Sequence, residues 1–276
     1  MSNLLNVATI QLNISWTDIE QNLLAARDAI AALPPDTDVA LLPEMFTTGF
    51  VTDQRLAARL AGGMESRVTG MMREWAREFN LAVAGSVIVR HDADGTLRNR
   101  MIFAEPSGET TIYDKRHLFT PSGENGTYAP GTRHIPVVRF RGWDLALAVC
   151  YDLRFPVWLR NTPRLDTDPE GPHLYDALLI VANWPDTRAY AWTHLLIARA
   201  IENQCYVAGA NRTGIDDYGV YSGHSEIFDP KGLPISSPLE GSPQPTCVAT
   251  LDMEALLRFR GKFPVGRDAD RYTIYL

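Results

Sequence analysis

Cysteine is scarce in this sequence, with three residues among 276. Cys150, Cys205 and Cys247 are widely separated, and no C-x-x-C pair occurs. A disulfide framework would need an even and denser set of cysteines, and a zinc site would need paired ligands. We therefore expect reduced thiols and no cysteine-based metal site.

Histidine and serine motifs of hydrolytic enzymes are also missing. The six histidines include no H-x-x-x-H or H-x-H pair, so a metal-dependent amidohydrolase has little support. No G-x-S-x-G occurs, and Gly85-Ser86 lies in an apolar run without a following helix signal, which argues against a serine hydrolase. We expect neither a metal nor a cofactor.

Basic charge and long hydrophobic runs are absent too. The formal net charge is −7 and no basic stripe occurs, which argues against a nucleic-acid partner. The longest apolar runs, such as Ala177–Ala182, are far too short to span a bilayer, and the first residues do not resemble a secretion signal. We expect a soluble, cytoplasmic protein that has no membrane partner and acts on a small molecule.

What is present is an ordinary globular composition, 45% hydrophobic and 21% charged, which is sufficient for a sizeable core. No linker divides the chain, so we predict a single domain over residues 1–276. Strands alternate with helices at first and paired strands follow. This order predicts an α/β fold in which two sheets are sandwiched between helical layers.

Hydrophobic periodicity and turn signals place the elements. Four helices are predicted, the first from a Thr17-to-Glu20 capping box to Ala32, and the others at Ser66–Asn80, Thr187–Glu202 and Met253–Phe259. Strands are predicted at Asn6–Leu12, Asp38–Leu42, Leu81–Val89, Asn99–Ala104, Thr110–Tyr113, Pro136–Arg139, Trp143–Val149, Asp176–Ala182, Cys205–Ala210, Ser225–Phe228 and Thr246–Leu251. Thr120–Gly131 is a Gly- and Pro-rich loop of the kind that borders sites, and Asn161–Leu174 is an exposed insertion without an assigned role.

Polar side chains follow several of these apolar strands directly. Glu44, Lys115, Cys150 and Asn183 each come at the end of a different strand. Because ligands gather at the carboxyl ends of strands in open α/β sheets, we expect these four residues to share one site.

The residue types in this group suit acyl transfer. A free thiol has a pKa of about 8.5, so a cysteine nucleophile needs a nearby base or cation. Glu44 can act as the base, and the Lys115 ammonium and the backbone N–H of Tyr151 can stabilise an oxyanion. Buried cysteines are more often core residues, which is our interpretation of Cys205 and Cys247.

Three segments carry a family resemblance. Leu42–Phe46, Tyr113–Phe119 and Cys150–Pro156 look like the signatures of the nitrilase (carbon–nitrogen hydrolase) family, and supporting segments extend the likeness over nearly the whole chain. The insertion after Arg160 is the main departure.

The resemblance implies a catalytic triad of Glu44, Lys115 and Cys150, assisted by Glu124. It also implies an αββα sandwich that forms a homodimer with four layers, αββα-αββα. By the same resemblance, Arg154 is interpreted as a structural ion-pair partner. Arg199 and Glu202, three residues apart on one helix, are interpreted as a structural pair.

Within the family, the motifs resemble the ω-amidase branch, whose members hydrolyse the side amides of 2-oxoglutaramate and 2-oxosuccinamate. The substrate is then a small amide with a free carboxylate, and the candidate binding residues are Phe46, Thr48, Tyr128, Asn183, Trp184 and Arg212. The same triad would also serve N-carbamoyl-amine or nitrile hydrolysis. A binding protein that has lost turnover is a further alternative, which the intact triad disfavours.

Overall fold

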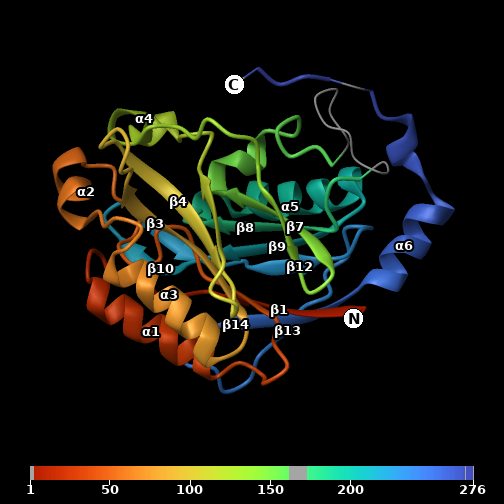
Figure 1. The fold of residues 1–276 in the computed structure, drawn as a ribbon, viewed down its shortest axis with the longest axis horizontal. Coiled ribbons are helices and arrows are strands. Elements are labelled where there is room, and N and C mark those ends of the chain that lie inside the picture. The colour runs from red at the N-terminus through yellow and green to blue at the C-terminus, as the bar shows by residue number, and fades with distance from the viewer. Residues whose placement is uncertain (1–2, 162–172, 271, 276) are drawn as a thin grey trace.

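The computed structural model describes residues 3–161, 173–270 and 272–275. Two sheets pack face to face, and helices cover the outer side of each (Figure 1). This is the α/β sandwich that the sequence predicts. Most of the predicted Asn161–Leu174 insertion lies outside the described residues.

The larger sheet has seven strands in the order β13-β14-β1-β2-β3-β4-β5. β1, β2 and β3 are parallel, whereas β4 is antiparallel to both β3 and β5. β5 therefore runs in the same direction as β2, and both strands end at the same edge. The strand bounds are β1 Leu4–Ile10, β2 Val39–Leu41, β3 Ala82–Arg90, β4 Leu97–Ala104, β5 Thr110–Asp114, β13 Ser237–Pro238 and β14 Thr246–Asp252.

The smaller sheet has five strands in the order β12-β9-β8-β7-β6. Its three central strands are parallel, and the outer two are antiparallel to their neighbours. A separate hairpin is formed by β10 and β11. The bounds are β6 Val137–Phe140, β7 Trp143–Val149, β8 Ala177–Ala182, β9 Tyr206–Asn211, β10 Thr213–Asp216, β11 Gly219–Ser222 and β12 Glu226–Phe228.

The helices form the outer layers. α1 and α3 lie side by side against the seven-stranded sheet, and α5 packs on β9 and β12 of the other sheet (Figure 1). α5 approaches β9 closely at Gly209, where a Cβ would lie 2.7 Å from Leu196 and 2.9 Å from Trp192. The helix bounds are α1 Ile19–Ala31, α2 Gln54–Leu60, α3 Arg67–Glu78, α4 Glu124–Thr127, α5 Ala189–Asn203 and α6 Met253–Lys262.

Strand alternation explains why both faces of the larger sheet are covered. In β2, Val39 and Leu41 join the core between the sheets, whereas Ala40 and the following Leu42 join the core under α1 and α3. Successive side chains of a strand point to opposite faces, so a continuous apolar run is the pattern of a strand that is buried on both sides.

The predicted helices and strands are found within a few residues of their expected positions, with three differences. The cap of α1 is Asp18, whose side chain accepts the Gln21 N–H, so the capping box predicted at Thr17 is wrong. α2, the β10–β11 hairpin and β13 were not predicted, because their short segments carry little periodicity. The Thr120–Gly131 loop contains a 3₁₀ turn and the short helix α4.

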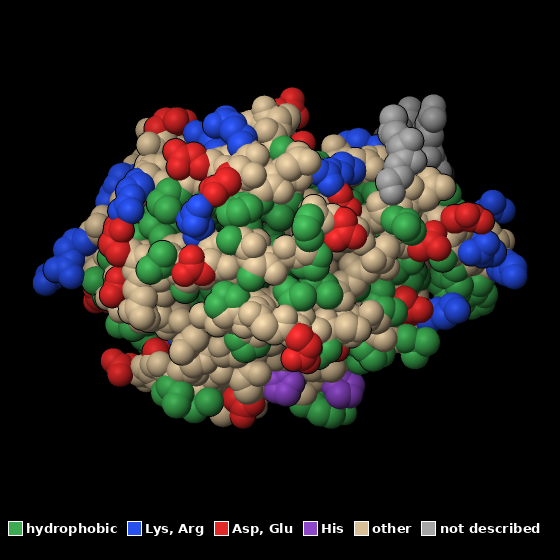
Figure 2. All heavy atoms as spheres, turned by 90° about the horizontal axis from the view of Figure 1, so that it is seen from below, with side chains coloured by type: hydrophobic (Ala, Val, Ile, Leu, Met, Phe, Trp, Pro, Cys, Tyr) green, Lys and Arg blue, Asp and Glu red, His purple; other side chains and the backbone are tan. Residues whose placement is uncertain are grey.

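The surface gives two further observations. Within the described ranges, no helix is long and apolar enough to cross a membrane. On the face seen in Figure 2, acidic and basic side chains are interspersed, with hydrophobic ones between them, and basic side chains do not gather into a stripe.

Candidate active site

The carboxyl ends of strands from both sheets lie close together, and a polar residue follows each of these strands. Glu44 follows β2, Lys115 follows β5, Cys150 follows β7 and Asn183 follows β8. The N–H of Glu44 donates to the carbonyl of Ala182 over 3.4 Å, which joins the two sheets at this point. The predicted grouping of these four strand-end residues is therefore observed.

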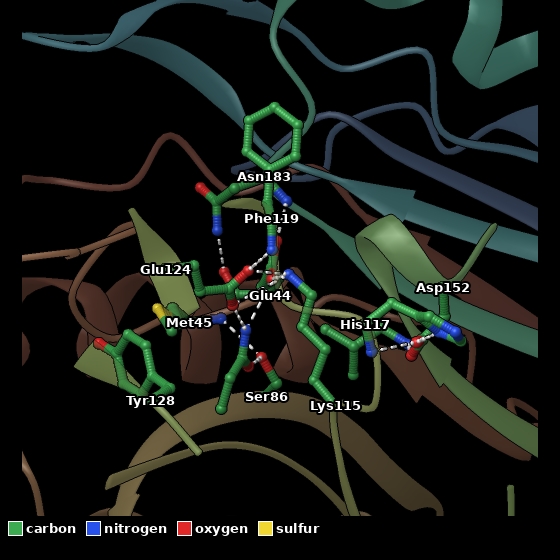
Figure 3. Close-up of polar contacts among 12 residues, drawn as sticks. Glu44, Met45, Ser86, Lys115, His117, Phe119, Glu124, Tyr128, Asp152 and Asn183 are labelled. Carbon is green, nitrogen blue, oxygen red and sulfur yellow. Dashed lines mark hydrogen bonds and ion pairs between the residues drawn. The ribbon is translucent and has the colours of Figure 1, made fainter. Parts of the chain in front are cut away.

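Lys115 lies between two carboxylates (Figure 3). Its Nζ is 2.8 Å from Oε1 of Glu44 and 3.0 and 2.9 Å from the two oxygens of Glu124. All three side chains are fully buried, with 0% exposure. Burial alone would lower the pKa of Lys115, but the charges of Glu124 and Glu44 outweigh it and hold the pKa well above its ordinary value. The raised pKa favours the ammonium form of the lysine.

Asn99 in β4 holds both carboxylates in place. Its Nδ2 donates to Glu44 over 2.7 Å and to Glu124 over 3.1 Å, and its Oδ1 accepts from Ser86 in β3 over 2.8 Å. Ser86 Oγ in turn accepts the Met45 N–H over 2.9 Å. Sequence reasoning missed Asn99 and gave Ser86 no part in the site. A polar residue inside an otherwise apolar strand, as at Ser86 in β3 and Asn99 in β4, was the signal that could have identified them.

Glu124 begins the short helix α4, inside the loop that was expected to border a site. Its Oε2 accepts the Phe119 N–H over 2.5 Å in addition to the bonds from Lys115 and Asn99. Burial raises the pKa of Glu124, although Lys115 acts in the opposite direction. The carboxyl therefore takes up a proton more readily than an exposed glutamate does.

Cys150 occupies a strained turn. It begins the 3₁₀ turn Cys150–Arg154 and has φ of +46°, a left-handed conformation that costs a non-glycine residue about 1–3 kcal/mol. Met45, next to Glu44, has φ of +43°. Burial, followed by the charge of Glu44, raises the pKa of the Cys150 thiol well above its ordinary value. The resting thiol is therefore protonated, and attack requires that a base remove its proton.

Asp152 fixes the cysteine turn to the segment that carries Lys115. Its buried carboxylate accepts the Val149 N–H over 3.1 Å, the His117 N–H over 3.0 Å and the Tyr113 hydroxyl over 2.8 Å. Figure 3 shows the bond between Asp152 and His117 beside Lys115. The two sheets thus hold Cys150 and Lys115 in a fixed relation.

A cavity of about 260 Å³ opens onto Cys150. Tyr151, predicted as an oxyanion donor, and Asn183 and Trp184, predicted as substrate-binding residues, also line it. Tyr151 is the second residue of the 3₁₀ turn, where N–H groups have no partner within the turn itself. The Oδ1 of Asn183 is buried without a hydrogen-bond partner among the described residues.

Phe46, Thr48 and Tyr128 were predicted to bind substrate, but they are not among the described residues that line this cavity. Phe46 faces the outer core under α1 and α3. The Thr48 hydroxyl donates to the carbonyl of Gly49 over 2.9 Å, and the Tyr128 hydroxyl donates to the carbonyl of Val51 over 2.6 Å. The hydroxyl groups of Thr48 and Tyr128 therefore both form hydrogen bonds to backbone carbonyls of the protein.

Arg212 is also absent from the cavity lining. Its side chain has 0% exposure, pairs with Asp216 over 2.6 Å and donates to the carbonyl of Ile14 over 2.9 Å. The guanidinium therefore anchors the β10–β11 hairpin, and its role as a substrate-binding residue stays a prediction.

The structure changes the interpretation of Arg154. It lines the cavity, and among the described residues no carboxylate pairs with it, so its interpretation as a structural ion-pair partner is wrong. Arg188, which sequence reasoning did not single out, lines the same cavity. Arg199, by contrast, pairs with Glu202 over 2.7 Å and donates to the carbonyl of Leu153, as expected of a structural residue.

The other two cysteines lie away from this arrangement. Cys205 is fully buried, with its Sγ 3.9 Å from the carbonyl oxygen of Arg199 in α5, and Cys247 is half-buried in β14. Neither lines the cavity around Cys150.

Comparison with known proteins gives consistent similarities. Residues 6–260 match the family model described as carbon-nitrogen hydrolase. The chain is 40% identical to the omega-amidase YafV of Yersinia enterocolitica, with 98% of each covered, and 32% identical to the 2-oxoglutaramate amidase of Bacillus subtilis, with 95% and 96% covered. A crystal structure of a CN-hydrolase superfamily protein of Xanthomonas campestris, with an arsenic adduct in its active site, is 36% identical, with a TM-score of 0.89 and 100% of each chain covered.

Proposed function

The chain belongs to the carbon–nitrogen hydrolase family, and we propose that it is an ω-amidase, which hydrolyses the side amide of small 2-oxo acid amides. The observation that carries this proposal is the position of Cys150, which lines a small cavity at the strand ends that also bring Glu44, Lys115 and Glu124 together. The relatives named omega-amidase and 2-oxoglutaramate amidase support the substrate class.

In the first half of the proposed reaction, Glu44 takes the thiol proton as Cys150 Sγ attacks the amide carbonyl carbon. The raised pKa of the thiol makes this base necessary, because little thiolate is present beforehand. The Lys115 ammonium and the Tyr151 N–H stabilise the oxyanion. The carbon–nitrogen bond then breaks, the proton passes to the leaving nitrogen, and ammonia departs to leave a thioester.

In the second half, water attacks the thioester while Glu44 takes its proton. The carbon–sulfur bond breaks, the sulfur regains a proton and the 2-oxo dicarboxylate leaves. Glu124 holds Lys115 in place through both halves, because it contacts the Lys115 ammonium with both oxygens. Each turnover consumes one amide and one water and releases one acid and one ammonia.

Asn183 favours an amide over a nitrile. Its Nδ2 donates to the carbonyl of Glu44, which fixes the orientation of the side chain and leaves Oδ1 buried without a hydrogen-bond partner among the described residues. An unpaired buried acceptor costs free energy unless a donor fills it. An amide NH₂ supplies such a donor, whereas a nitrile has no N–H.

A panel of substrates tests the proposal. Ammonia release is measured from 2-oxoglutaramate, 2-oxosuccinamate, N-carbamoyl amines, nitriles and simple aliphatic amides, with Cys150→Ala as the blank. We expect the two oxo-acid amides to have the highest kcat/KM. Good turnover of another class, with none of the oxo-acid amides, would reject the ω-amidase assignment, and no turnover of any would favour a binding protein.

The assembly and location are part of the same proposal. We expect a cytoplasmic homodimer, and α5 supports an interface because Tyr190 and Ile201 leave 78% and 51% of their surface exposed. Light scattering during gel filtration should give twice the chain mass. A monomeric mass at micromolar concentration would count against the dimer.

A further inference from the structure

Tyr221, in β11, differs from the other buried tyrosines in the hydrogen bonding of its hydroxyl. It has 5% exposure, and no residue in the described ranges forms a hydrogen bond with this hydroxyl. The other buried tyrosines of these ranges each donate to a carboxylate or a backbone carbonyl: Tyr113, Tyr128, Tyr175 and Tyr206. A buried hydroxyl without a partner costs free energy, so the one on Tyr221 is available to a molecule that binds there.

The Tyr221 hydroxyl opens onto the cavity around Cys150. Tyr221 is one of the residues that line this cavity. Among the described residues, several polar side-chain atoms are sealed from solvent without a partner, and the Tyr221 hydroxyl is not one of them. The small exposed part of this side chain therefore includes the hydroxyl, where a small molecule in the cavity can reach it.

The β10–β11 hairpin holds the ring of Tyr221 in place. Tyr221 pairs with Gly214 across the hairpin, and the Cζ of Arg212 lies 4.3 Å from the ring centroid. Arg212 is itself fixed by its ion pair with Asp216. This contact uses the face of the ring and leaves its hydroxyl free. A ligand therefore meets a donor that is already oriented, which reduces the entropy lost on binding.

The hydroxyl is a neutral donor near the reacting groups. Burial, followed by the charge of Asp216, raises the pKa of Tyr221 above its ordinary value, and the charges of Glu44 and Cys150 act in the same direction. The influence of Glu44 and Cys150 agrees with the position of the ring beside the cavity. Because its pKa is raised, the phenol keeps its proton near neutral pH and can donate it in a hydrogen bond.

A 2-oxo acid amide offers three groups that accept hydrogen bonds. The amide oxygen becomes the oxyanion, for which the proposed reaction already has the Lys115 ammonium and the Tyr151 N–H as donors. The carboxylate is an anion, and a charged donor matches it better than a phenol does. The 2-oxo oxygen is a neutral acceptor, and a neutral hydroxyl is the matching donor.

Other neutral side-chain donors of the cavity wall are less suited to this oxygen. Those of Ser122, Asn183 and Trp184 each donate to a backbone carbonyl. Tyr151 and Tyr218 also line the cavity but are more exposed than Tyr221, so water competes more strongly for their hydroxyls.

We propose that the Tyr221 hydroxyl donates a hydrogen bond to the 2-oxo oxygen of the substrate, and so selects 2-oxo acid amides over amides of the same length without the oxo group. The proposed bond deepens the proposed function and rests on it for the identity of the substrate. A site with a buried polar group discriminates against a ligand that lacks the matching group, because the buried donor is then left unpaired.

Protection of Cys150 tests the bond without turnover. 2-Oxoglutarate and glutarate differ only in the oxo group, and each should slow the alkylation of Cys150 by iodoacetamide when it occupies the cavity. The concentration for half-maximal protection is measured by mass spectrometry of the Cys150 peptide. We expect 2-oxoglutarate to protect at a concentration about three- to tenfold lower than glutarate, which is the effect of one neutral hydrogen bond.

Tyr221→Phe removes the hydroxyl and keeps the ring. The ratio of the two protecting concentrations should fall to about one, and stability in urea should not decrease, because the hydroxyl has no partner among the described residues. Tyr206→Phe is the matched control, since its buried hydroxyl donates to the carbonyl of Asp252 over 3.1 Å and it lies outside the cavity lining. It should lower stability and leave the ratio unchanged.

Three results would overturn the bond to the 2-oxo oxygen. The first is a wild-type ratio of about one, and the second is an unchanged ratio in Tyr221→Phe. The third is an equal loss of affinity for both ligands in Tyr221→Phe, because the hydroxyl would then bind a group that the two ligands share.

Turnover separates the proposed bond from the proposed function. For 2-oxosuccinamate, Tyr221→Phe should lower kcat/KM by about three- to tenfold, whereas for succinamate it should change by less than about twofold. A protection ratio that Tyr221→Phe abolishes, without turnover of any oxo-acid amide, would leave the bond standing and reject the ω-amidase assignment. Turnover of those amides with the same preference over succinamate in Tyr221→Phe would do the reverse.

Discussion

The ammonium nitrogen of Lys115 lies 2.8 Å from Oε1 of Glu44, and neither side chain has any exposed surface. Glu124 contacts the same nitrogen, so one buried cation holds two buried carboxylates together. Removing one partner of such a group leaves charge without compensation inside the protein, which costs about 3–5 kcal/mol. The proposed catalytic group is thus also an element of stability.

Lys115→Met should therefore lose stability as well as activity. We expect the free energy of unfolding in urea to fall by about 3–5 kcal/mol, and kcat to fall by about a thousandfold because the oxyanion loses its cation. Lys262→Met, at an exposed lysine, should change neither quantity measurably. A Lys115→Met variant as stable as the wild type would show that the two carboxylates do not both carry charge.

Glu44→Gln should move thiol reactivity and turnover in opposite directions. The charge of Glu44 and its hydrogen bond to the thiol both raise the pKa of Cys150, so their loss should lower that pKa and increase the thiolate present at pH 8. Alkylation of Cys150 by iodoacetamide should become faster, while kcat for amides falls by about a hundredfold or more because the base is gone.

The pH profile of alkylation completes this test. In the wild type the rate should rise about tenfold for each pH unit from 7 to 9 without a plateau, since the thiol pKa lies well above its ordinary value. A plateau already reached below pH 7 would show a preformed thiolate, and Glu44 would then not be needed to remove the thiol proton.

The sequence predicts the strand-end residues of this site, for a physical reason that does not depend on tertiary detail. Apolar runs are read directly as strands, and the polar residue after each run must lie at a sheet edge. Parallel strands bring those edges together, so the order of residues along the chain is enough to group Glu44, Lys115 and Cys150.

The role of an arginine cannot be predicted in the same way. Arg212 and Arg154 look equivalent in sequence, since each follows a strand by a few residues. A guanidinium forms an internal ion pair only where another segment of the fold places a carboxylate next to it, as Asp216 lies next to Arg212. The sequence does not show where such a carboxylate will lie. Asn99 was missed for a related reason: its partners, Glu44 and Glu124, are 55 and 25 residues away.

Strain at Cys150 gives a prediction about glycine. Because the residue has φ of +46°, Cys150→Gly should be more stable than Cys150→Ala by about 1 kcal/mol, measured by urea unfolding. Cys205 is the matched control, because it is buried but is not among the described residues with positive φ. There the glycine variant should be the less stable of the two. The same order at both positions would argue against stored strain in the nucleophile turn.

The buried pair of Arg212 and Asp216 decides between two roles for that arginine. If Arg212 anchors the hairpin, Arg212→Met leaves Asp216 buried without a partner and should reduce the free energy of unfolding by about 3–5 kcal/mol. The double variant Arg212→Met with Asp216→Leu removes both charges and should recover most of that loss. KM should change only modestly, through the hairpin residue Tyr218, whose ring packs against that of Trp16 and lines the cavity. If instead Arg212→Met keeps the wild-type stability but raises KM for oxo-acid amides more than tenfold, Arg212 binds substrate after all, because an arginine that is not needed for folding would be free to contact the carboxylate.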